Sequence, residues 1–196
     1  MKYDLSKKLT IGASRTLTSL QKAMLTLLAV KSFEEISVQE LCEKAMLPRA
    51  TFYNYFDDKY DLLGYCFLTV HKQIDIGYQE AGNCQKRLST LMENFIDFFD
   101  QNIGAVQSIL KNNHPNQYFI NQIHFYLITN MMAAFKSSPN THQFKIPQEM
   151  AAKLYSESVL IILEWKYLHK KECSKAQAKE YLRMMVSGID VNRAGS

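Results

Sequence analysis

The chain has 196 residues, enough for one or two domains with a substantial hydrophobic core. Hydrophobic residues make up 47% of it and charged residues 21%, as in ordinary globular proteins, while 7 glycines and 4 prolines are too few for a fold rich in β-turns. The formal net charge of +4 does not identify a nucleic-acid-binding protein, but residues 1–56 carry 8 basic and 5 acidic side chains and the other 140 carry 15 and 14. A basic N-terminal quarter suits a phosphate backbone, and a solvated tail explains the same charges equally well.

The first predicted elements are an arm and two helices. Residues 1–13 are polar and weakly patterned, so we expect a flexible basic arm. Leucines and a methionine then recur on one face, which predicts a helix from about Thr16 to Lys31. Ser37 and Glu40 have the spacing of a capping box, in which each side chain accepts a hydrogen bond from the other residue's backbone N–H. A short second helix, about Val38 to Ala45, is therefore predicted directly after Ser37.

The next two helices follow after a very short turn. Pro48 suits the start of a third helix, Arg49 to about Phe56, because its fixed φ is already helical and its missing N–H is not needed there. Two aspartates then cap a fourth helix, Lys59 to about Ala81, with Gly82 as its stop. Three helices within about 45 residues, the last two joined by a short turn, indicate a helix-turn-helix.

The rest of the chain continues in helices. They are predicted at residues 86–102, 104–111, 117–136, 147–169 and 175–189, with one long connection at 137–145. The predicted fold is therefore all-α. We divide it into a helix-turn-helix domain, residues 1–63, whose first 13 residues are the arm, and a C-terminal helical domain, residues 64–196, for dimerisation and effector binding.

The third helix has the composition of a helix that enters the major groove. Phe52 and Phe56 are four residues apart and share a face, so we expect them to anchor the helix to the core. The other face carries short or polar side chains that can reach base edges. The groove-facing set is Arg49, Ala50, Thr51, Tyr53 and Asn54. Taken alone, the aromatic cluster would suit the core of an ordinary helical domain.

Residues 36–63 carry a family resemblance. The run Thr51-Phe52-Tyr53-Asn54-Tyr55-Phe56, followed by Lys59 and Leu62, resembles the DNA-binding domain of the TetR family, and the resemblance covers roughly residues 14–63. The chain departs from the family pattern in its turn, where Met46-Leu47-Pro48 stands in place of the usual glycine and serine, and at Tyr55, which is often histidine. These departures would alter phosphate contacts rather than the fold.

The resemblance implies a sequence-specific regulator of transcription that binds double-stranded operator DNA, most often as a repressor and sometimes as an activator. Ser37, Tyr55 and Lys59 are then expected to bind phosphates, and Lys8 and Arg15 to add contacts from the arm. The alternative is a helical protein-interaction adaptor that has kept the fold but lost DNA binding, which the unusual turn favours.

The last two helices are expected to form a homodimer interface, as the resemblance implies. Their apolar positions cover more than one face, so they could pack against their two-fold mates as a four-helix bundle. The residues expected at this interface are Leu154, Val159, Ile162, Trp165, Tyr181 and Met185. The alternative is that both helices close the core of a monomer.

Phenylalanine- and methionine-rich stretches suggest a site for a small apolar effector. The candidate lining residues are Phe95, Phe99, His124, Tyr126 and Met131. The same residues would fill a solid core equally well, and a lone histidine among apolar residues is more often part of a core than a ligand group. The effector that would release the regulator from DNA thus remains a hypothesis.

Catalysis and metal binding find no support in the sequence. The four cysteines have no metal-binding spacing, and no HExxH motif, Glu-x-x-His pair or phosphate loop occurs. We therefore expect neither enzymatic activity nor a cofactor or metal ion. The polar N-terminus does not have the form of a signal peptide and the apolar runs are too short to span a bilayer, so a cytoplasmic protein without a membrane partner is expected.

Overall fold

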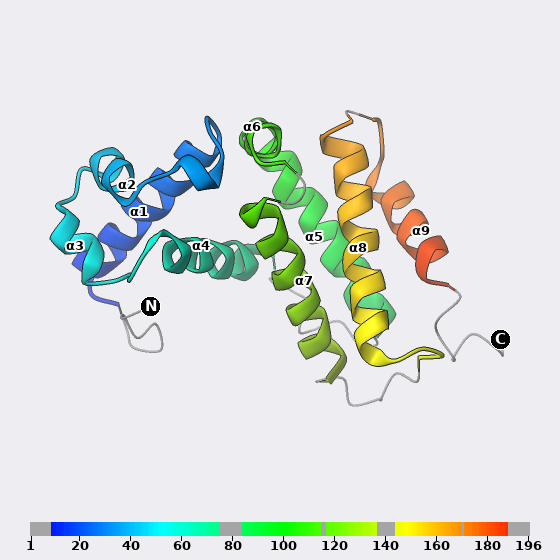
Figure 1. The fold of residues 1–196 in the computed structure, drawn as a ribbon. Coiled ribbons are helices and arrows are strands. Elements are labelled where there is room, and N and C mark those ends of the chain that lie inside the picture. Colours follow the sequence, from blue (N-terminus) through cyan, green and yellow to red (C-terminus); the bar gives the residue numbers. More distant parts are fainter. Residues whose placement is uncertain (1–8, 75–83, 115–116, 137–143, 170, 188–196) are drawn as a thin grey trace. The chain divides into compact units, whose positions relative to one another are not determined.

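The computed structural model describes residues 9–74, 84–114, 117–136, 144–169 and 171–187, and every regular element in this part of the chain is a helix (Figure 1). The all-α prediction is confirmed. The elements are α1 (Ile11–Leu28), the 3₁₀ turn η1 (Phe33–Glu35), α2 (Val38–Ala45), α3 (Arg49–Tyr53), α4 (Lys59–Ile74), α5 (Cys84–Gln101), α6 (Ile103–Asn112), α7 (Tyr118–Lys136), α8 (Gln148–Tyr167) and α9 (Lys175–Val186).

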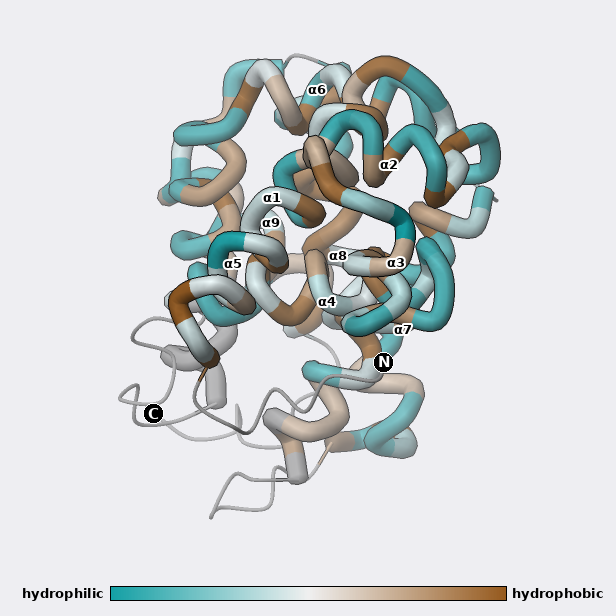
Figure 2. The backbone as a smooth tube through the Cα atoms, turned by 90° about the vertical axis from the view of Figure 1, so that its left-hand side faces the viewer, coloured by the Kyte–Doolittle hydropathy of each residue, from teal (hydrophilic) through white to brown (hydrophobic). Residues whose placement is uncertain are grey.

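The helices divide into two compact units. The first unit lies within residues 1–72 and 104–119, and the second within 73–103 and 120–196. The first unit therefore combines α1–α4 with α6, which follows them only after α5 in the sequence. Figure 2 shows hydrophobic and hydrophilic residues alternating along the helices, as expected where each helix buries one face and exposes the other.

Helix α1 begins earlier than predicted. It starts at Ile11 rather than near Thr16, because the Thr10 side chain accepts a hydrogen bond from the backbone N–H of Ala13 at 3.1 Å and so caps the helix. Residues 11–13 of the expected arm are therefore helical, and residues 1–8 lie outside the described part. The buried face of α1 packs against α2. Its buried side chains are Ala13, Leu17, Leu20, Ala23, Met24 and Leu28.

Helix α2 has the predicted bounds, and the capping box that predicts them is present. The Glu40 N–H donates to Ser37 Oγ at 3.2 Å, and the Ser37 N–H donates to Glu40 Oε2 at 2.9 Å. The helix ends in a Schellman motif, with the Leu47 N–H donating to the Cys42 carbonyl at 2.9 Å and Met46 in the left-handed region at φ 54°. Met46 thus takes the conformation for which glycine is favoured.

Helix α3 is shorter than predicted. It ends at Tyr53 rather than near Phe56, because the Asn54 and Tyr55 N–H groups donate to carbonyls three residues back, which tightens the last turn. Asp58 then caps α4, its Oδ1 accepting hydrogen bonds from the N–H groups of Tyr60 and Asp61 at 2.9 Å each. The short α3 is held between a Schellman turn before it and a capped helix after it.

Two consecutive asparagines join α6 to the end of α1. Asn112 Nδ2 donates to the Ala29 carbonyl at 2.9 Å, and Asn113 Nδ2 donates to the Leu28 carbonyl at 3.3 Å. These carbonyls belong to the last turn of α1, where no intrahelical donor remains. Asn113 is 1% exposed, so its amide sits in the core of the first unit.

In the second unit, α9 packs against α5 and α8. Lysines of α8 and α9 pair with carboxylates along α5: Lys179 with Glu93 at 2.7 Å, Lys175 with Asp97, and Lys166 with Asp100 at 3.5 Å. The bounds of α5–α8 agree with the prediction to within two residues at each end. The predicted ends of the fourth and ninth helices, and Gly82, fall outside the described residues.

Candidate nucleic-acid interface

Helix α3 is anchored on one side and exposed on the other. Phe52 and Phe56 are both fully buried, at 0% exposure, which confirms the predicted anchor. Their rings lie 5.7 Å apart, and Phe56 also contacts the ring of Tyr65 on α4 at 5.8 Å. On the outer side the exposed residues are Arg49, Ala50, Tyr53 and Asn54, while Thr51 and Tyr55 are half-buried.

Two of the exposed side chains support each other. The Arg49 guanidinium donates to the Tyr53 hydroxyl at 3.4 Å, one helical turn away. The Tyr53 ring packs edge-on against Phe52 at 5.4 Å, so the buried anchor also orients an exposed residue. Residues with donor, acceptor and aromatic groups are thereby presented side by side on a short rigid helix, which is the arrangement that direct reading of base edges requires.

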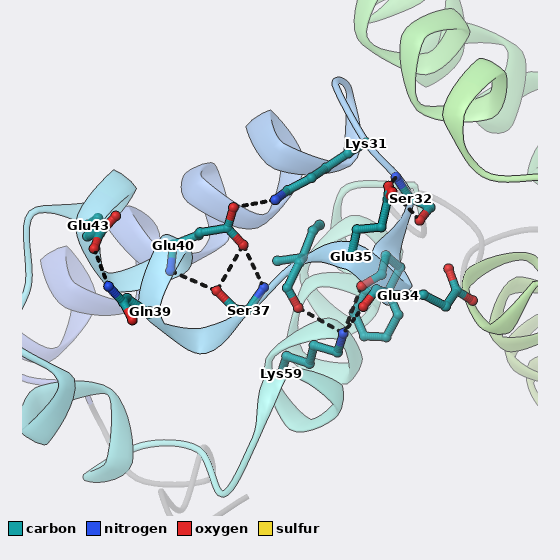
Figure 3. A network of polar contacts seen from close by, with 11 residues as sticks. Lys31, Ser32, Glu34, Glu35, Ser37, Gln39, Glu40, Glu43 and Lys59 are labelled. Atoms are coloured by element: carbon teal, nitrogen blue, oxygen red, sulfur yellow. Dashed lines mark hydrogen bonds and ion pairs between the residues drawn. The ribbon is translucent and has the colours of Figure 1, made fainter.

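The start of α2 carries an anion of its own. Ser37 Oγ lies 2.8 Å from Glu40 Oε2, and Glu40 is also paired with Lys31 (Figure 3). The hydrogen bonds from Lys31 and then Ser37 lower the pKa of the Glu40 carboxyl to about 2. Glu40 therefore stays ionised at neutral pH, and a phosphate approaching Ser37 meets a carboxylate that already uses the hydroxyl.

Lys59 lies where α4 begins, but its ammonium group points back into the protein. Lys59 Nζ donates to the carbonyls of Phe33 at 2.9 Å, Glu34 at 2.9 Å and Ile36 at 2.8 Å (Figure 3). The Phe33 ring centroid lies 4.7 Å from the same nitrogen. Burial lowers the pKa of Lys59 from its ordinary value. Sequence reasoning missed these contacts because they join residues more than 20 positions apart.

Of the two basic residues expected in the arm, the structure describes only Arg15. Arg15 is exposed on α1, and it therefore stands on a helix rather than on a flexible segment. Lys8 lies outside the described residues. A contact from Arg15 would consequently be made by the fixed N-terminal part of α1.

The residues expected to bind an effector belong to α5 and α7. Phe95 and Phe99 stack with centroids 6.3 Å apart, and Phe99 lies 5.3 Å from the Tyr167 ring. His124 is paired with Glu157 of α8, Nδ1 to Oε1 at 3.1 Å. Tyr126 follows His124 by two positions, so the two side chains lie on nearly opposite sides of α7. Met131 is buried, at 4% exposure, whereas Phe95, Phe99, His124 and Tyr126 are half-buried.

The residues expected at the dimer interface lie on two sides of α8 and α9. Val159 and Ile162 are buried within the protomer, at 3% exposure each, and Leu154 is half-buried. Trp165, Tyr181 and Met185 are 48%, 41% and 42% exposed. The exposed apolar residues of the two helices, which we call the α8–α9 face, are Met150, Ile161, Trp165, Leu168, Tyr181, Met184 and Met185.

Metal sites and membrane spans were sought in the described residues. Within them, no three His, Cys, Asp or Glu side chains gather in a way that could hold a metal ion. None of the helices in the same part of the chain combines the length and the apolarity needed to cross a bilayer. Cys42, Cys66 and Cys173 are buried free thiols, and burial raises the pKa of Cys66 to about 12.

Comparison with known proteins agrees with this geometry. Residues 22–66 match the family described as bacterial regulatory proteins, tetR family. None of the curated proteins compared with the chain matches it.

Solved structures share the fold over almost the whole chain. A putative tetR family transcription regulator from Shewanella sp. PV-4 aligns with a TM-score of 0.66 and 14% identity, covering 90% of this chain and 99% of the other. A TetR-family regulator from Streptomyces coelicolor A3 aligns with a TM-score of 0.67 and 12% identity, covering 92% of this chain and 98% of the other. NalD, the secondary repressor of the MexAB-OprM multidrug efflux pump in Pseudomonas aeruginosa, aligns with a TM-score of 0.62 and 13% identity, covering 91% of this chain and 99% of the other. At these identities the likeness shows the fold.

Proposed function

Because residues 22–66 match the family described as bacterial regulatory proteins, tetR family, we propose that the chain regulates transcription by binding operator DNA in a sequence-specific manner as a homodimer. The observation that carries the proposal is the two-sided α3. Phe52 of this helix and Phe56 just after it are fully buried, while Arg49, Tyr53 and Asn54 are exposed. A helix of this kind can enter a major groove without any rearrangement of the core.

The contact residues divide by what they can read. We assign base edges to the outer side of α3 and its C-cap, namely Arg49, Ala50, Thr51, Tyr53 and Asn54, of which Thr51 is half-buried. Arg49 has the donors for guanine, Asn54 the donor and acceptor for adenine, and Tyr53 a ring for a thymine methyl group. Ser37 and Tyr55 are assigned to phosphates, with Arg15 and Lys8 as additional basic contacts. For Ser37 this requires its hydroxyl to leave Glu40.

The regulator is proposed to be a repressor released by a small apolar effector. NalD is named as a repressor, and this chain shares its fold. The candidate residues for the effector site are Phe95, Phe99, His124, Tyr126 and Met131. The stacked Phe95 and Phe99 rings would offer apolar contacts and the His124–Glu157 pair polar ones, while Tyr126 would contact the effector from the other side of α7. As a protein that acts on the chromosome it would work in the cytoplasm, without a membrane partner, a metal cofactor or catalytic activity.

A second copy of the chain is the proposed occupant of the α8–α9 face. Large apolar residues gathered on two neighbouring helices are costly to leave in water. Trp165 and the exposed side chains of α9 would lie in this interface, while Val159 and Ile162 support it from inside the protomer. The two-fold axis would then present two α3 helices to two half-sites.

Selection from a randomised pool of DNA duplexes tests the proposal. The wild-type protein should enrich a two-fold symmetric sequence, and a gel shift should show this duplex bound in preference to a scrambled one. Tyr53→Ala should lower the affinity for the selected duplex by about 1–3 kcal/mol and leave binding to the scrambled duplex almost unchanged. Failure to enrich any sequence would favour the adaptor that has kept the fold without DNA binding.

A further inference from the structure

The turn η1 is held from three sides by polar contacts within the first unit. Lys59 at the start of α4 holds the carbonyls of Phe33, Glu34 and Ile36. Asn113 at the end of α6 accepts the Phe33 N–H with its Oδ1 at 2.9 Å. The Glu34 side chain accepts the Tyr118 N–H at 2.8 Å, where α7 begins. Backbone groups of one short turn thereby bond to α4 and α6, and its Glu34 side chain to α7.

Aromatic packing fixes the same turn. Phe33 is 0% exposed, and its ring stacks on Tyr118 at 5.4 Å and meets Tyr60 edge-on at 5.2 Å. The Lys59 ammonium lies over the Phe33 ring, so charge and ring packing act on one residue. The backbone of η1 therefore cannot shift without disturbing the buried Phe33 ring and its contacts with the two tyrosines.

The turn leads directly into the helix-turn-helix. Ile36, whose carbonyl Lys59 holds, immediately precedes Ser37, the N-cap of α2. Helix α2 continues into the Schellman turn at Met46 and then into α3. The direction in which α2 leaves η1 thus sets where α3 lies relative to α4.

The ammonium of a lysine has three protons, and here three carbonyls accept hydrogen bonds from it. The carboxylate of Asp58 also occupies the N-terminus of α4, which is the position where a phosphate would otherwise be favoured. Binding a phosphate through Lys59 would therefore break three hydrogen bonds, two of them part-buried, and bring the phosphate close to the Asp58 carboxylate.

We propose that Lys59 is a positioning residue, which clamps η1 to α4 and thereby orients α2 and α3 for DNA, rather than a residue that binds a phosphate. This inference rests on the proposed DNA-binding function and replaces the role expected for Lys59 from the sequence. Asn113 is the counterpart of Lys59. Both bind the backbone of Phe33, because Asn113 accepts a hydrogen bond from its N–H and Lys59 donates one to its carbonyl.

Arginine separates the two roles. A guanidinium is a planar fork that binds a phosphate at least as well as an ammonium does, but its donors cannot converge on three carbonyls in the way that a compact ammonium can. A phosphate contact would therefore tolerate Lys59→Arg, and a positioning clamp would not.

The test compares Lys59→Arg, Lys59→Met and Lys59→Gln with Lys44→Met, which removes an exposed positive charge from α2. Affinity is measured for the duplex selected by the wild type and for a scrambled duplex, at several salt concentrations and at a temperature where each variant is fully folded by circular dichroism. We expect the three Lys59 variants to lose at least about tenfold in the ratio of selected to scrambled affinity. The slope of log affinity against log salt should change by less than about half a unit, whereas loss of a phosphate contact lowers it by about one.

Two outcomes would overturn the proposal. Wild-type affinity in Lys59→Arg, with a slope lowered by about one in Lys59→Met, would mean a phosphate contact. An unchanged affinity ratio in all folded variants would mean a residue that only stabilises the fold.

A DNA-free measurement keeps this inference separate from the proposed function. Hydrogen exchange of the amides in the first turn of α2 should accelerate in Lys59→Arg and not in Lys44→Met. Unchanged exchange would contradict the clamp even if the wild type bound no DNA at all. Accelerated exchange without any DNA binding would instead show a real clamp in a protein whose proposed function is wrong.

Discussion

At the scale of single residues, the turn between α2 and α3 is unusual because a methionine occupies a left-handed conformation. Met46 has φ 54° and is 90% exposed, so its side chain contributes almost no burial in return for the strained backbone. The Schellman hydrogen bonds of this turn need the left-handed residue whatever its side chain. The sequence shows only that glycine is missing there, and not that the backbone keeps the glycine conformation.

Met46→Gly should therefore stabilise the protein. Removing Cβ relieves about 1–2 kcal/mol of strain in the left-handed backbone. Glycine is also more flexible in the unfolded chain, which cancels part of this effect and leaves a net stabilisation of about 0.5–1 kcal/mol. Met46→Ala keeps Cβ and should change the stability little, because the side chain is 90% exposed. Urea unfolding followed by circular dichroism measures both, and an equal midpoint for the glycine and alanine variants would refute the strain.

A second residue, Glu40, should make the stability of the first unit depend on pH. Its carboxyl has a pKa of about 2 in the folded protein against an ordinary value of 4.5. Since the unfolded chain binds the proton more tightly, this contribution is complete above about pH 4.5 and is lost as the pH falls towards about 2. Glu40→Gln removes it. The difference in urea midpoint between wild type and variant should shrink over that pH window, and a difference that stays constant from pH 6 to about pH 2.5 would contradict the assignment.

At the scale of elements, the sequence predicts best what local spacing controls. The start of α2 follows from Ser37 and Glu40, three residues apart, and the burial of Phe52 and Phe56 on one side follows from their spacing of four. The early start of α1 depends on a threonine cap that the apolar pattern does not include. The role of Lys59 and the attachment of α6 to α1 depend on contacts between distant residues, which no local pattern reveals.

The attachment of α6 should be essential for the first unit. Asn113→Ala leaves the buried Phe33 N–H and Leu28 carbonyl without their partner, and an unsatisfied buried group costs about 1–3 kcal/mol. We therefore expect a loss of about 2–4 kcal/mol in the free energy of unfolding. Asn102→Ala is the matched control, because the Asn102 amide makes one exposed contact with the Phe98 carbonyl. Equal losses in the two variants would mean that α6 does not hold the first unit.

At the scale of the whole molecule, the association of two copies depends on which face of α8 and α9 is exposed. The sequence places apolar residues on more than one face of α8, so it cannot show which of them face the protomer's own core. The structure buries Val159 and Ile162 and exposes Ile161, Trp165 and Leu168. Contacts within the second unit decide this division, which periodicity alone does not reveal. The proposed interface keeps Trp165, Tyr181 and Met185 from the sequence prediction and adds exposed neighbours that include Ile161 and Leu168.

A charge in the α8–α9 face should separate the dimer. Trp165 is 48% exposed and is the only tryptophan, so Trp165→Glu places a carboxylate in the proposed interface, where burying it unpaired is costly. Light scattering after size exclusion at micromolar concentration should give twice 22.7 kDa for the wild type and a mass close to 22.7 kDa for this variant. Phe125→Glu, at a 66% exposed apolar residue of α7 outside this face, should remain a dimer. A monomeric wild type would contradict the dimer. Dissociation by Phe125→Glu but not by Trp165→Glu would mean that the two copies associate through another face.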